Sequence, residues 1–237
     1  MAVAVSFPAV SDAVGPAMHI PDGFLSLPVA AAGYVASAVA IAVAVRMTNR
    51  RLGERAVPLM GVMGAFIFAA QMMNFPVAGG TSGHMLGGAL AAICLGPWAA
   101  ILVMTSVVAL QAVLFQDGGL GALGANVFTM GVTTALAGAL FYALLRPLAE
   151  RSTGGRVAAS FAVAWLTVVI ASVVLSLELA LSGTSPVGVV LPAMLGVHVF
   201  IGIGEGLITA AAVSFLLATR PDLVGVAPNV TPEGVRA

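Results

Sequence analysis

Lysine is absent from this chain of 237 residues, and charged residues of any kind make up only 8% of it. A Walker A nucleotide site and a Schiff-base enzyme both need a lysine ammonium at a fixed place, so the sequence excludes these two classes. We therefore expect that the protein hydrolyses no ATP by itself. The formal net charge is zero, which argues against a nucleic-acid partner, because nucleic-acid binding needs a basic surface.

Cysteine is almost as scarce, since Cys94 stands alone inside an apolar stretch. One thiol allows neither a disulfide framework nor a cysteine-cluster metal site. The residues that are present are mostly apolar: 60% are hydrophobic, and the mean hydropathy is +1.11. A soluble domain usually carries about 25% charged residues, so this surface suits a lipid bilayer rather than water. The sequence therefore predicts a multi-pass protein of the inner or plasma membrane of the cell.

Apolar runs divide the chain into an expected all-α bundle of seven membrane-spanning helices. A helix needs about 20 apolar residues to cross the hydrocarbon core, and charges and Gly/Pro clusters separate segments near that size. We predict these helices at 27–45, 58–75, 84–95, 98–115, 123–145, 157–181 and 189–218. The third is too short to cross the bilayer upright.

Arginine placement predicts which way the bundle faces. Cytoplasmic loops collect Arg and Lys near the ends of spans. Here the arginines follow the first, fifth and seventh segments, as Arg46, Arg50, Arg51 and Arg55, then Arg146, Arg151 and Arg156, then Arg220. They share one side of the membrane only if Pro97 separates two crossings. We therefore expect seven spans, with the amino terminus outside and the carboxyl terminus inside.

The two ends of the chain lie outside this predicted membrane domain, which covers residues 18–219. Residues 1–17 are apolar but have no positive start and are interrupted by Pro8 and Pro16, so they resemble neither a spanning helix nor an ordinary signal peptide. We interpret them as an extension that is either not translated or removed. Residues 220–237 contain three prolines and are expected to form a short cytoplasmic tail.

The first histidine lies in the sequence Met18-His19-Ile20-Pro21-Asp22. If Met18 were the first residue, its α-amine, the amide nitrogen of His19 and a His19 ring nitrogen would chelate one metal ion in fused five- and six-membered rings. A second imidazole would complete four nitrogens in a plane, a geometry that suits nickel(II) or copper(II) and that low-spin cobalt(II) accepts. The alternative is an ordinary exposed histidine.

The second histidine follows a Gly-rich segment, 79–83, between two apolar runs. Irregular backbone at the edge of the membrane is tolerated only where protein or a cavity covers it, and such a loop can direct His84 toward a site. Four polar residues are placed to support a ligand imidazole from behind: Gln71, Asn74, Thr81 and Ser82. The alternative is a turn in which His84 caps the next helix.

Four further ionisable residues lie on the outer side or within predicted spans. Asp117 and Glu178 are expected on the outer side, with Glu178 facing water. His198 and Glu205 lie seven residues apart in the last span, hence on one helix face. An ionisable residue inside a membrane is a candidate for function, so this pair would relay protons, bind a metal or fix helix packing.

Several of these motifs occur together in one known family. The motifs are Met18-His19-Ile20-Pro21-Asp22-Gly23-Phe24-Leu25, Gln71-Met72-Met73-Asn74-Phe75-Pro76-Val77, Gly80-Thr81-Ser82-Gly83-His84, the segment 118–126, and His198 with Gly202-Ile203-Gly204-Glu205-Gly206. Together they resemble the CbiM/NikM family, the substrate-binding membrane subunits of energy-coupling-factor transporters for cobalt and nickel. The resemblance covers about residues 18–219.

The resemblance implies a seven-helix bundle whose amino terminus dips into its centre. It implies that the amine of Met18, the amide and ring of His19 and the ring of His84 hold nickel(II) or cobalt(II) as cargo, with no permanent cofactor. Asp22, Asn74, Thr81 and Ser82 would support these ligands. A Met18 that follows another residue offers no amine, so the implied site requires that residues 1–17 be absent.

The resemblance also implies partners. They are a transmembrane coupling subunit (CbiQ/NikQ-like), two ATPase subunits (CbiO/NikO-like) and a small accessory membrane subunit (CbiN/NikN-like). The predicted function is therefore that of a non-enzymatic transporter subunit for metal import, and the sequence leaves nickel and cobalt open.

Two other functions remain as alternatives. Gly80-Thr81-Ser82-Gly83 has the G-x-S-G form of rhomboid proteases, so Ser82 with His198 as its base would make an intramembrane serine hydrolase. Glu205 and His198 would alternatively serve a proton-coupled carrier.

Overall fold

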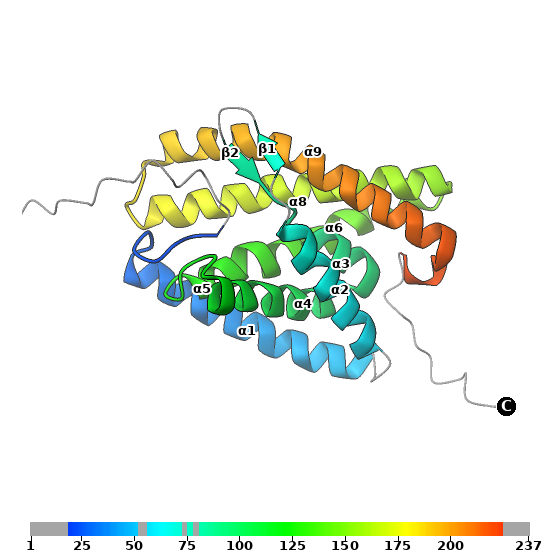
Figure 1. Cartoon of the computed structure of the whole chain (residues 1–237), viewed down its shortest axis with the longest axis horizontal. Helices are drawn as coiled ribbons and strands as arrows, with labels where there is room; N and C mark the ends of the chain where they lie inside the picture. The colour runs from blue at the N-terminus through cyan, green and yellow to red at the C-terminus, as the bar shows by residue number, and fades with distance from the viewer. Residues whose placement is uncertain (1–18, 52–55, 73–74, 78–80, 225–237) are drawn as a thin grey trace, which may run out of the picture.

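The computed structural model describes residues 19–51, 56–72, 75–77 and 81–224, which form a bundle of helices (Figure 1). In chain order the elements are α1 (Leu27–Arg51), α2 (Ala56–Gln71), β1 (Phe75–Val77), β2 (Thr81–Gly83), α3 (Gly88–Leu95), α4 (Pro97–Leu110), the π-helical η1 (Gln111–Phe115), α5 (Leu123–Asn126), the π-helical η2 (Val127–Thr133), α6 (Thr134–Leu144), α7 (Arg146–Ala149), α8 (Thr153–Leu181), α9 (Val187–Thr219) and the 3-10 helix η3 (Pro221–Leu223).

Five stretches in the described part of the chain are long and apolar enough to cross a membrane. They are Leu27–Arg50, Pro97–Phe115, Leu123–Leu144, Thr153–Leu181 and Val187–Thr219. These five match five of the seven predicted spans. The two other predicted spans also contain helices, but α2 has 16 residues and α3 only eight. The structure is therefore that of a multi-pass membrane protein with five helices long and apolar enough to cross the bilayer and two shorter apolar helices.

The predicted all-α class is confirmed, with one short hairpin in the Gly-rich segment as a local exception. β1 and β2 pair antiparallel there, with Pro76 opposite Ser82. Consequently α2 ends at Gln71, four residues before the predicted end, and α3 begins at Gly88 rather than at His84. Pro76 explains the first difference, because proline lacks an N–H and disfavours helix in the residue before it.

A left-handed glycine explains the late start of α3. Gly87 has φ +84, and a Cβ there would lie 2.6 Å from Ile67 of α2. A side chain would be both strained and crowded at this position. Residues 84–87 therefore stay irregular until the first turn of α3.

The break between α3 and α4 occurs where the sequence predicted it. Gly96 has φ +80 and closes α3, and Pro97 occupies the first turn of α4. Proline is favoured at the first helical position, because its missing N–H would have no helical partner there. The region 84–115 is therefore two helices rather than one.

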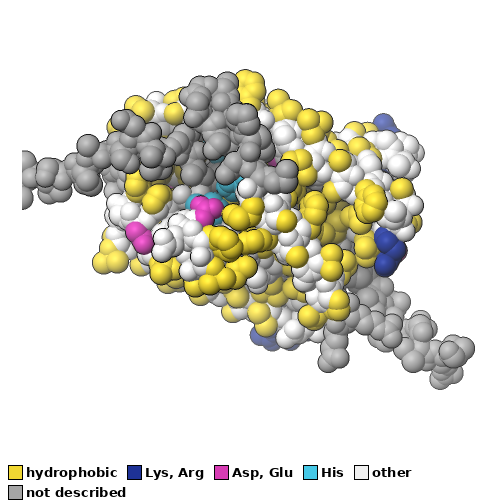
Figure 2. Space-filling view, viewed as in Figure 1, with side chains coloured by type: hydrophobic (Ala, Val, Ile, Leu, Met, Phe, Trp, Pro, Cys, Tyr) yellow, Lys and Arg dark blue, Asp and Glu magenta, His cyan; other side chains and the backbone are white. Residues whose placement is uncertain are grey.

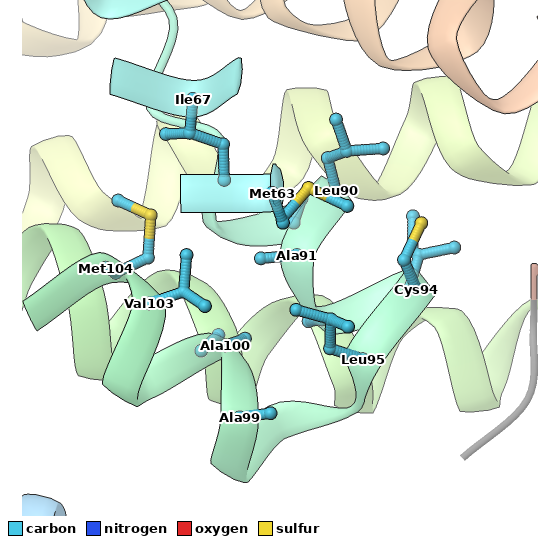
Figure 3. Close-up of a cluster of buried hydrophobic side chains, with 14 of the residues drawn as sticks. Met63, Ile67, Leu90, Ala91, Cys94, Leu95, Ala99, Ala100, Val103 and Met104 are labelled. Atoms are coloured by element: carbon cyan, nitrogen blue, oxygen red, sulfur yellow. The ribbon is translucent and has the colours of Figure 1, made fainter. Parts of the chain in front are cut away.

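The centre of the bundle is α3, because all eight of its residues are buried. Figure 3 shows Leu90 and Cys94 of α3 in one cluster with Met63 of α2 and Met104 of α4. On its remaining sides α3 packs against α6 and α8. A helix that is apolar all round suits such an interior position, and the position of α3 fixes where the preceding His84 segment lies.

The pair α8 and α9 packs closely through glycine. A Cβ on Gly202 would lie 2.9 Å from Trp165, and one on Gly206 would lie 2.7 Å from Phe161. Small residues that allow close approach are typical of helix contacts in membranes. This packing holds the face of α9 that carries His198 and Glu205 against the rest of the bundle, and both side chains are buried.

Several helix ends that precede or follow arginines meet at one end of the bundle. In Figure 1 the carboxyl-terminal ends of α1 and α9 and the connection into α8 all lie at the right. In the same orientation, Figure 2 shows arginine side chains toward the right and lower edge and carboxylates toward the left. The arginines therefore gather toward one end of the bundle, where Glu150 and Asp222 pair with Arg146 and Arg220.

Candidate metal site

His19 and His84 lie next to each other, although they are far apart in the sequence. The centroids of their rings are 5.4 Å apart, and the ring planes are tilted by 37°. His19 is 2% exposed, and His84 is half-buried. Figure 2 shows histidine side chains on this face close to a carboxylate. The structure thus brings together the two imidazoles that the sequence nominated.

Three ring nitrogens of this pair have no hydrogen-bond partner within the described residues. They are both nitrogens of His19 and Nε2 of His84, and all three are buried. Nδ1 of His84 lies 2.9 Å from the carbonyl oxygen of Met85. Because a carbonyl only accepts, Nδ1 carries the proton and Nε2 keeps its lone pair. Buried nitrogens without partners are rare in folded proteins, and lone pairs in such positions are suited to a metal ion.

The His19 ring is neutral at physiological pH. Burial lowers the pKa of His19 to about 4, and the neighbouring Asp117 carboxylate opposes this shift only in part. A metal binds the neutral imidazole. His19 therefore offers a lone pair without first losing a proton from its ring.

Asp117 is a site residue that the sequence analysis identified only as an outer carboxylate. Its Oδ2 lies 3.7 Å from Nε2 of His19. A carboxylate beside the second nitrogen of a ligand histidine orients the ring and fixes its tautomer. Asp117 follows η1, so only the tertiary fold brings it to His19, and no local signal in the sequence indicates this contact.

Asn126 holds the backbone next to His19. Its Oδ1 accepts from the N–H of Ile20 at 2.8 Å, and its Nδ2 donates to the Ile20 carbonyl at 3.1 Å. The N–H of Gly119 donates to the same carbonyl at 2.9 Å. Residues 19–20 are therefore fixed to the turn that precedes α5 and to α5 itself. The polar Asn126 within an apolar run was the signal that could have identified this role.

Asp22 supports the segment rather than either imidazole. Its Oδ1 accepts from the N–H of Gly121 at 2.7 Å, and a Cβ on Gly119 would collide with its side chain. The neighbouring Gly118, with φ +94, lies against His19: a Cβ there would be 3.3 Å from Nδ1 of that ring. The motif 118–126 thus forms the wall on which residues 19–22 lie.

Glu205 binds the backbone that follows His84. Its two carboxylate oxygens accept from the N–H groups of Leu86, at 2.6 Å, and Gly87, at 2.8 Å. Gln71 donates to the carbonyl of Leu86 at 2.5 Å and itself accepts from Gln111 at 2.8 Å. Gln71 was expected to support the imidazole, but it contacts the loop backbone instead.

His198 and Glu178 are the remaining ionisable residues of interest. Nδ1 of His198 donates to the carbonyl of Met194 at 2.7 Å, and its buried Nε2 has no partner within the described ranges. The expectation that Glu178 simply faces water was wrong, because its carboxylate accepts from the hydroxyl of Thr129 at 3.0 Å. Burial among neighbouring helices explains why it needs this partner.

The other predicted site residues lie outside what the structure describes. Met18 and Asn74 are not described, and the backbones of Thr81 and Ser82 form part of β2 while their side chains are not described. Among residues 19–51, 56–72, 75–77 and 81–224, no three His, Cys, Asp or Glu side chains form a metal-binding group. Within these ranges the candidate ligands are therefore the two imidazoles of His19 and His84.

Comparison with known proteins shows what the chain resembles. The family model for the cobalt uptake substrate-specific transmembrane region, CbiM, matches residues 19–223. A protein of Haloquadratum walsbyi named for metal transport is 44% identical over 87% of this chain and 93% of its own length. A protein of Archaeoglobus fulgidus named as a fused nickel transport protein, NikMN, is 42% identical over 87% of this chain and 68% of its own length.

The likeness extends to three dimensions. A crystal structure of a truncated transition metal transporter has a TM-score of 0.77 to this chain and 33% sequence identity, and the match covers 84% of this chain and 98% of that one. With the family model covering most of its length, the chain therefore belongs to the CbiM family of cobalt uptake substrate-specific transmembrane proteins.

Proposed function

We propose that this protein is the substrate-specific membrane subunit of an energy-coupling-factor importer for nickel(II) or cobalt(II). The observation that carries the proposal is the adjacent pair His19 and His84, whose buried ring nitrogens lack partners among the described residues. Neutral imidazole nitrogen is a preferred ligand of both metals. Family membership and the relatives' names for nickel and metal transport support the same function.

The proposed coordination uses four nitrogens. Nδ1 of His19 closes a six-membered ring with the amide nitrogen of the same residue, and that amide closes a five-membered ring with the amine of Met18. Nε2 of His84, which carries a lone pair, completes the plane. This arrangement requires a chain that begins at Met18, so residues 1–17 would be either untranslated or removed. Both Met18 and residues 1–17 lie outside the described part of the chain.

The proposed placement in the inner or plasma membrane has seven crossings, the amino terminus outside and the carboxyl terminus inside. The common end of α1, α9 and the α8 connection supports it, because the arginines near those ends would all face the cytoplasm. The short helices α2 and α3 would each make one of the crossings. Residues 18–219 would form the membrane domain, and residues 220–237 the cytoplasmic tail.

The proposed transporter takes its energy from other subunits. The absence of lysine supports this division, since a P-loop ATPase needs one. We propose a CbiQ/NikQ-like coupling subunit and CbiO/NikO-like ATPase subunits as partners. The name NikMN of the fused relative supports a small CbiN/NikN-like accessory subunit as well. No observation on the described residues supports the two alternative functions, an intramembrane hydrolase that uses Ser82 and His198 or a proton-coupled carrier that uses Glu205 and His198.

Metal uptake tests the proposal directly. Replacing His84 by Ala removes one imidazole, so we expect cells that express the complete transporter to lose uptake of nickel or cobalt. Ser82→Ala serves as the comparison. If the protein imports metal, this variant should keep part of its uptake of nickel or cobalt. If the protein were a serine hydrolase, the same variant would lose its hydrolase activity completely. Normal uptake by His84→Ala would overturn the metal site. Mass spectrometry of the purified protein's amino terminus should show a chain that begins at Met18.

A further inference from the structure

We infer that Glu205 is a positioning residue for metal binding, because its carboxylate fixes the backbone that carries His84. The inference rests on the proposed function and adds a role for a residue that the sequence left between packing and support. Glu205 is fully buried, and both of its oxygens are used by one short segment, the N–H groups of Leu86 and Gly87.

The start of α3 explains why a carboxylate is needed here. α3 begins at Gly88 in the interior of the bundle, and the first N–H groups of a helix have no partner within it. Gly87 occupies the cap position and has no side chain with which to satisfy them. Glu205 accepts from the N–H of the cap residue Gly87 and from that of the preceding Leu86, and it adds a negative charge near the positive end of the helix, which is a favourable combination.

The rest of the Leu86 peptide is held from the opposite side. Gln71 donates to the Leu86 carbonyl, and Gln111 donates to Gln71. The N–H and the carbonyl of the same residue are therefore fixed by α9 on one side and by α2 on the other. Among the described residues, no arginine or histidine forms an ion pair with Glu205, so the loop backbone is its principal partner.

A short path connects this clamp to the ligand nitrogen. Leu86 follows Met85, and the Met85 carbonyl accepts from Nδ1 of His84. Fixing Leu86 thus fixes the carbonyl that orients the ring, and the ring orientation decides where Nε2 points. When a group that orients a metal ligand through hydrogen bonds is removed, the metal affinity typically falls by about 10- to 100-fold.

Glu205→Gln tests this role with little change in shape. The amide retains one acceptor but places an NH₂ donor against a backbone N–H. We expect nickel(II) ions to bind about 10- to 100-fold more weakly. At saturating nickel(II) we also expect a shifted visible ligand-field band, because His84 would leave its proper orientation. Glu205→Asp keeps both acceptors but shortens the side chain, so its affinity should fall between those of the wild type and Glu205→Gln.

Glu178→Gln is the matched control. It makes the same change in a second glutamate of the helical bundle, which is partly buried and whose partner is the hydroxyl of Thr129 and not the His84 segment. An amide oxygen still accepts from that hydroxyl, so nickel affinity and spectrum should stay as in the wild type. All variants are compared in the purified full protein, with the folded fraction measured by thermal unfolding before nickel is added.

The outcomes separate the inference from the function on which it rests. Wild-type affinity and spectrum in folded Glu205→Gln would overturn the positioning role, and so would a loss that merely follows the folded fraction. If Glu205→Gln does not fold, Glu205→Asp decides by the same two measurements. Wild-type protein that binds no nickel(II), or a His84→Ala variant that binds it normally, would instead overturn the proposed metal site, whatever Glu205 does.

Discussion

Asp117 places its Oδ2 3.7 Å from Nε2 of His19, so the two ring nitrogens of this histidine have different surroundings. Nε2 faces a carboxylate, which favours the tautomer with the proton on Nε2. Nδ1 then keeps its lone pair and lies on the side of Gly118. Nδ1 is also the nitrogen that can share a chelate ring with the amide of its own residue. The position of Asp117 therefore selects the ring nitrogen that the proposed site uses.

Asp117→Asn should weaken nickel binding by about tenfold, because the neutral amide carries no charge that favours a proton on Nε2 and raises the basicity of the ring. Titration of purified protein with nickel(II) measures the effect. Asp222→Asn is the control, since Asp222 pairs with Arg220 near the end of α9 and does not contact the histidines. An unchanged affinity in Asp117→Asn would show that Asp117 does not orient His19.

Gly118→Ala should disturb the same ring from the other side. Its Cβ would lie 3.3 Å from Nδ1 of His19 and 3.0 Å from Nδ2 of Asn126, and the φ of +94 disfavours any side chain. We expect weaker nickel binding together with a lower unfolding temperature. Gly183→Ala separates the two causes, because Gly183 has φ +73 but nothing within 4 Å of an added Cβ. That control should lose stability and keep its nickel affinity; equal losses of affinity in both variants would contradict the crowding of His19.

The sequence predicted the parts of this molecule that depend on local pattern. The break at Gly96 and Pro97 follows from the conformations of these two residues, and the five long spans follow from the length of the apolar runs. The β1–β2 pairing was missed because the segment was interpreted as an irregular loop, and three-residue strands give too short an alternation to detect.

In the candidate site, too, local sequence pattern indicated some residues, while others were brought in only by tertiary packing. His19 and His84 could be nominated because each is a rare polar residue beside unusual backbone. Their supporting contacts could not, since Asp117 approaches His19, and Glu205 binds the backbone after His84, only once distant segments pack. The family resemblance implied that Asp22 supports the metal ligands, and in the structure its carboxylate accepts from the N–H of Gly121. The two partners are 99 positions apart in the sequence. Tertiary packing decides such a contact, so a position in the sequence does not reveal it.

Acid should destabilise the metal-free protein through His19. Its pKa is lowered from 6.5 to about 4 by burial, so between these pH values the unfolded chain binds this proton and the folded chain does not. The free energy of unfolding therefore rises with pH across this window and is lost on acidification, by on the order of 3 kcal/mol in total. Thermal unfolding in detergent from pH 6.5 to pH 4 measures this dependence. His19→Gln has no such proton, so its unfolding temperature should fall less steeply; parallel curves would contradict the shifted pKa.

Asn126→Asp should release the segment that carries His19. Aspartate can still accept from the N–H of Ile20, but it replaces the donor to the Ile20 carbonyl by a second acceptor. Two oxygens facing each other in a buried place are unfavourable, so residues 19–20 should leave the wall formed by 118–126. We expect faster backbone hydrogen exchange at Ile20 and weaker nickel binding. Asn49→Asp adds the same charge at an exposed position of α1 and should change neither. Protection of Ile20 that equals the wild type in folded Asn126→Asp would mean that Gly119 alone is sufficient to hold the segment.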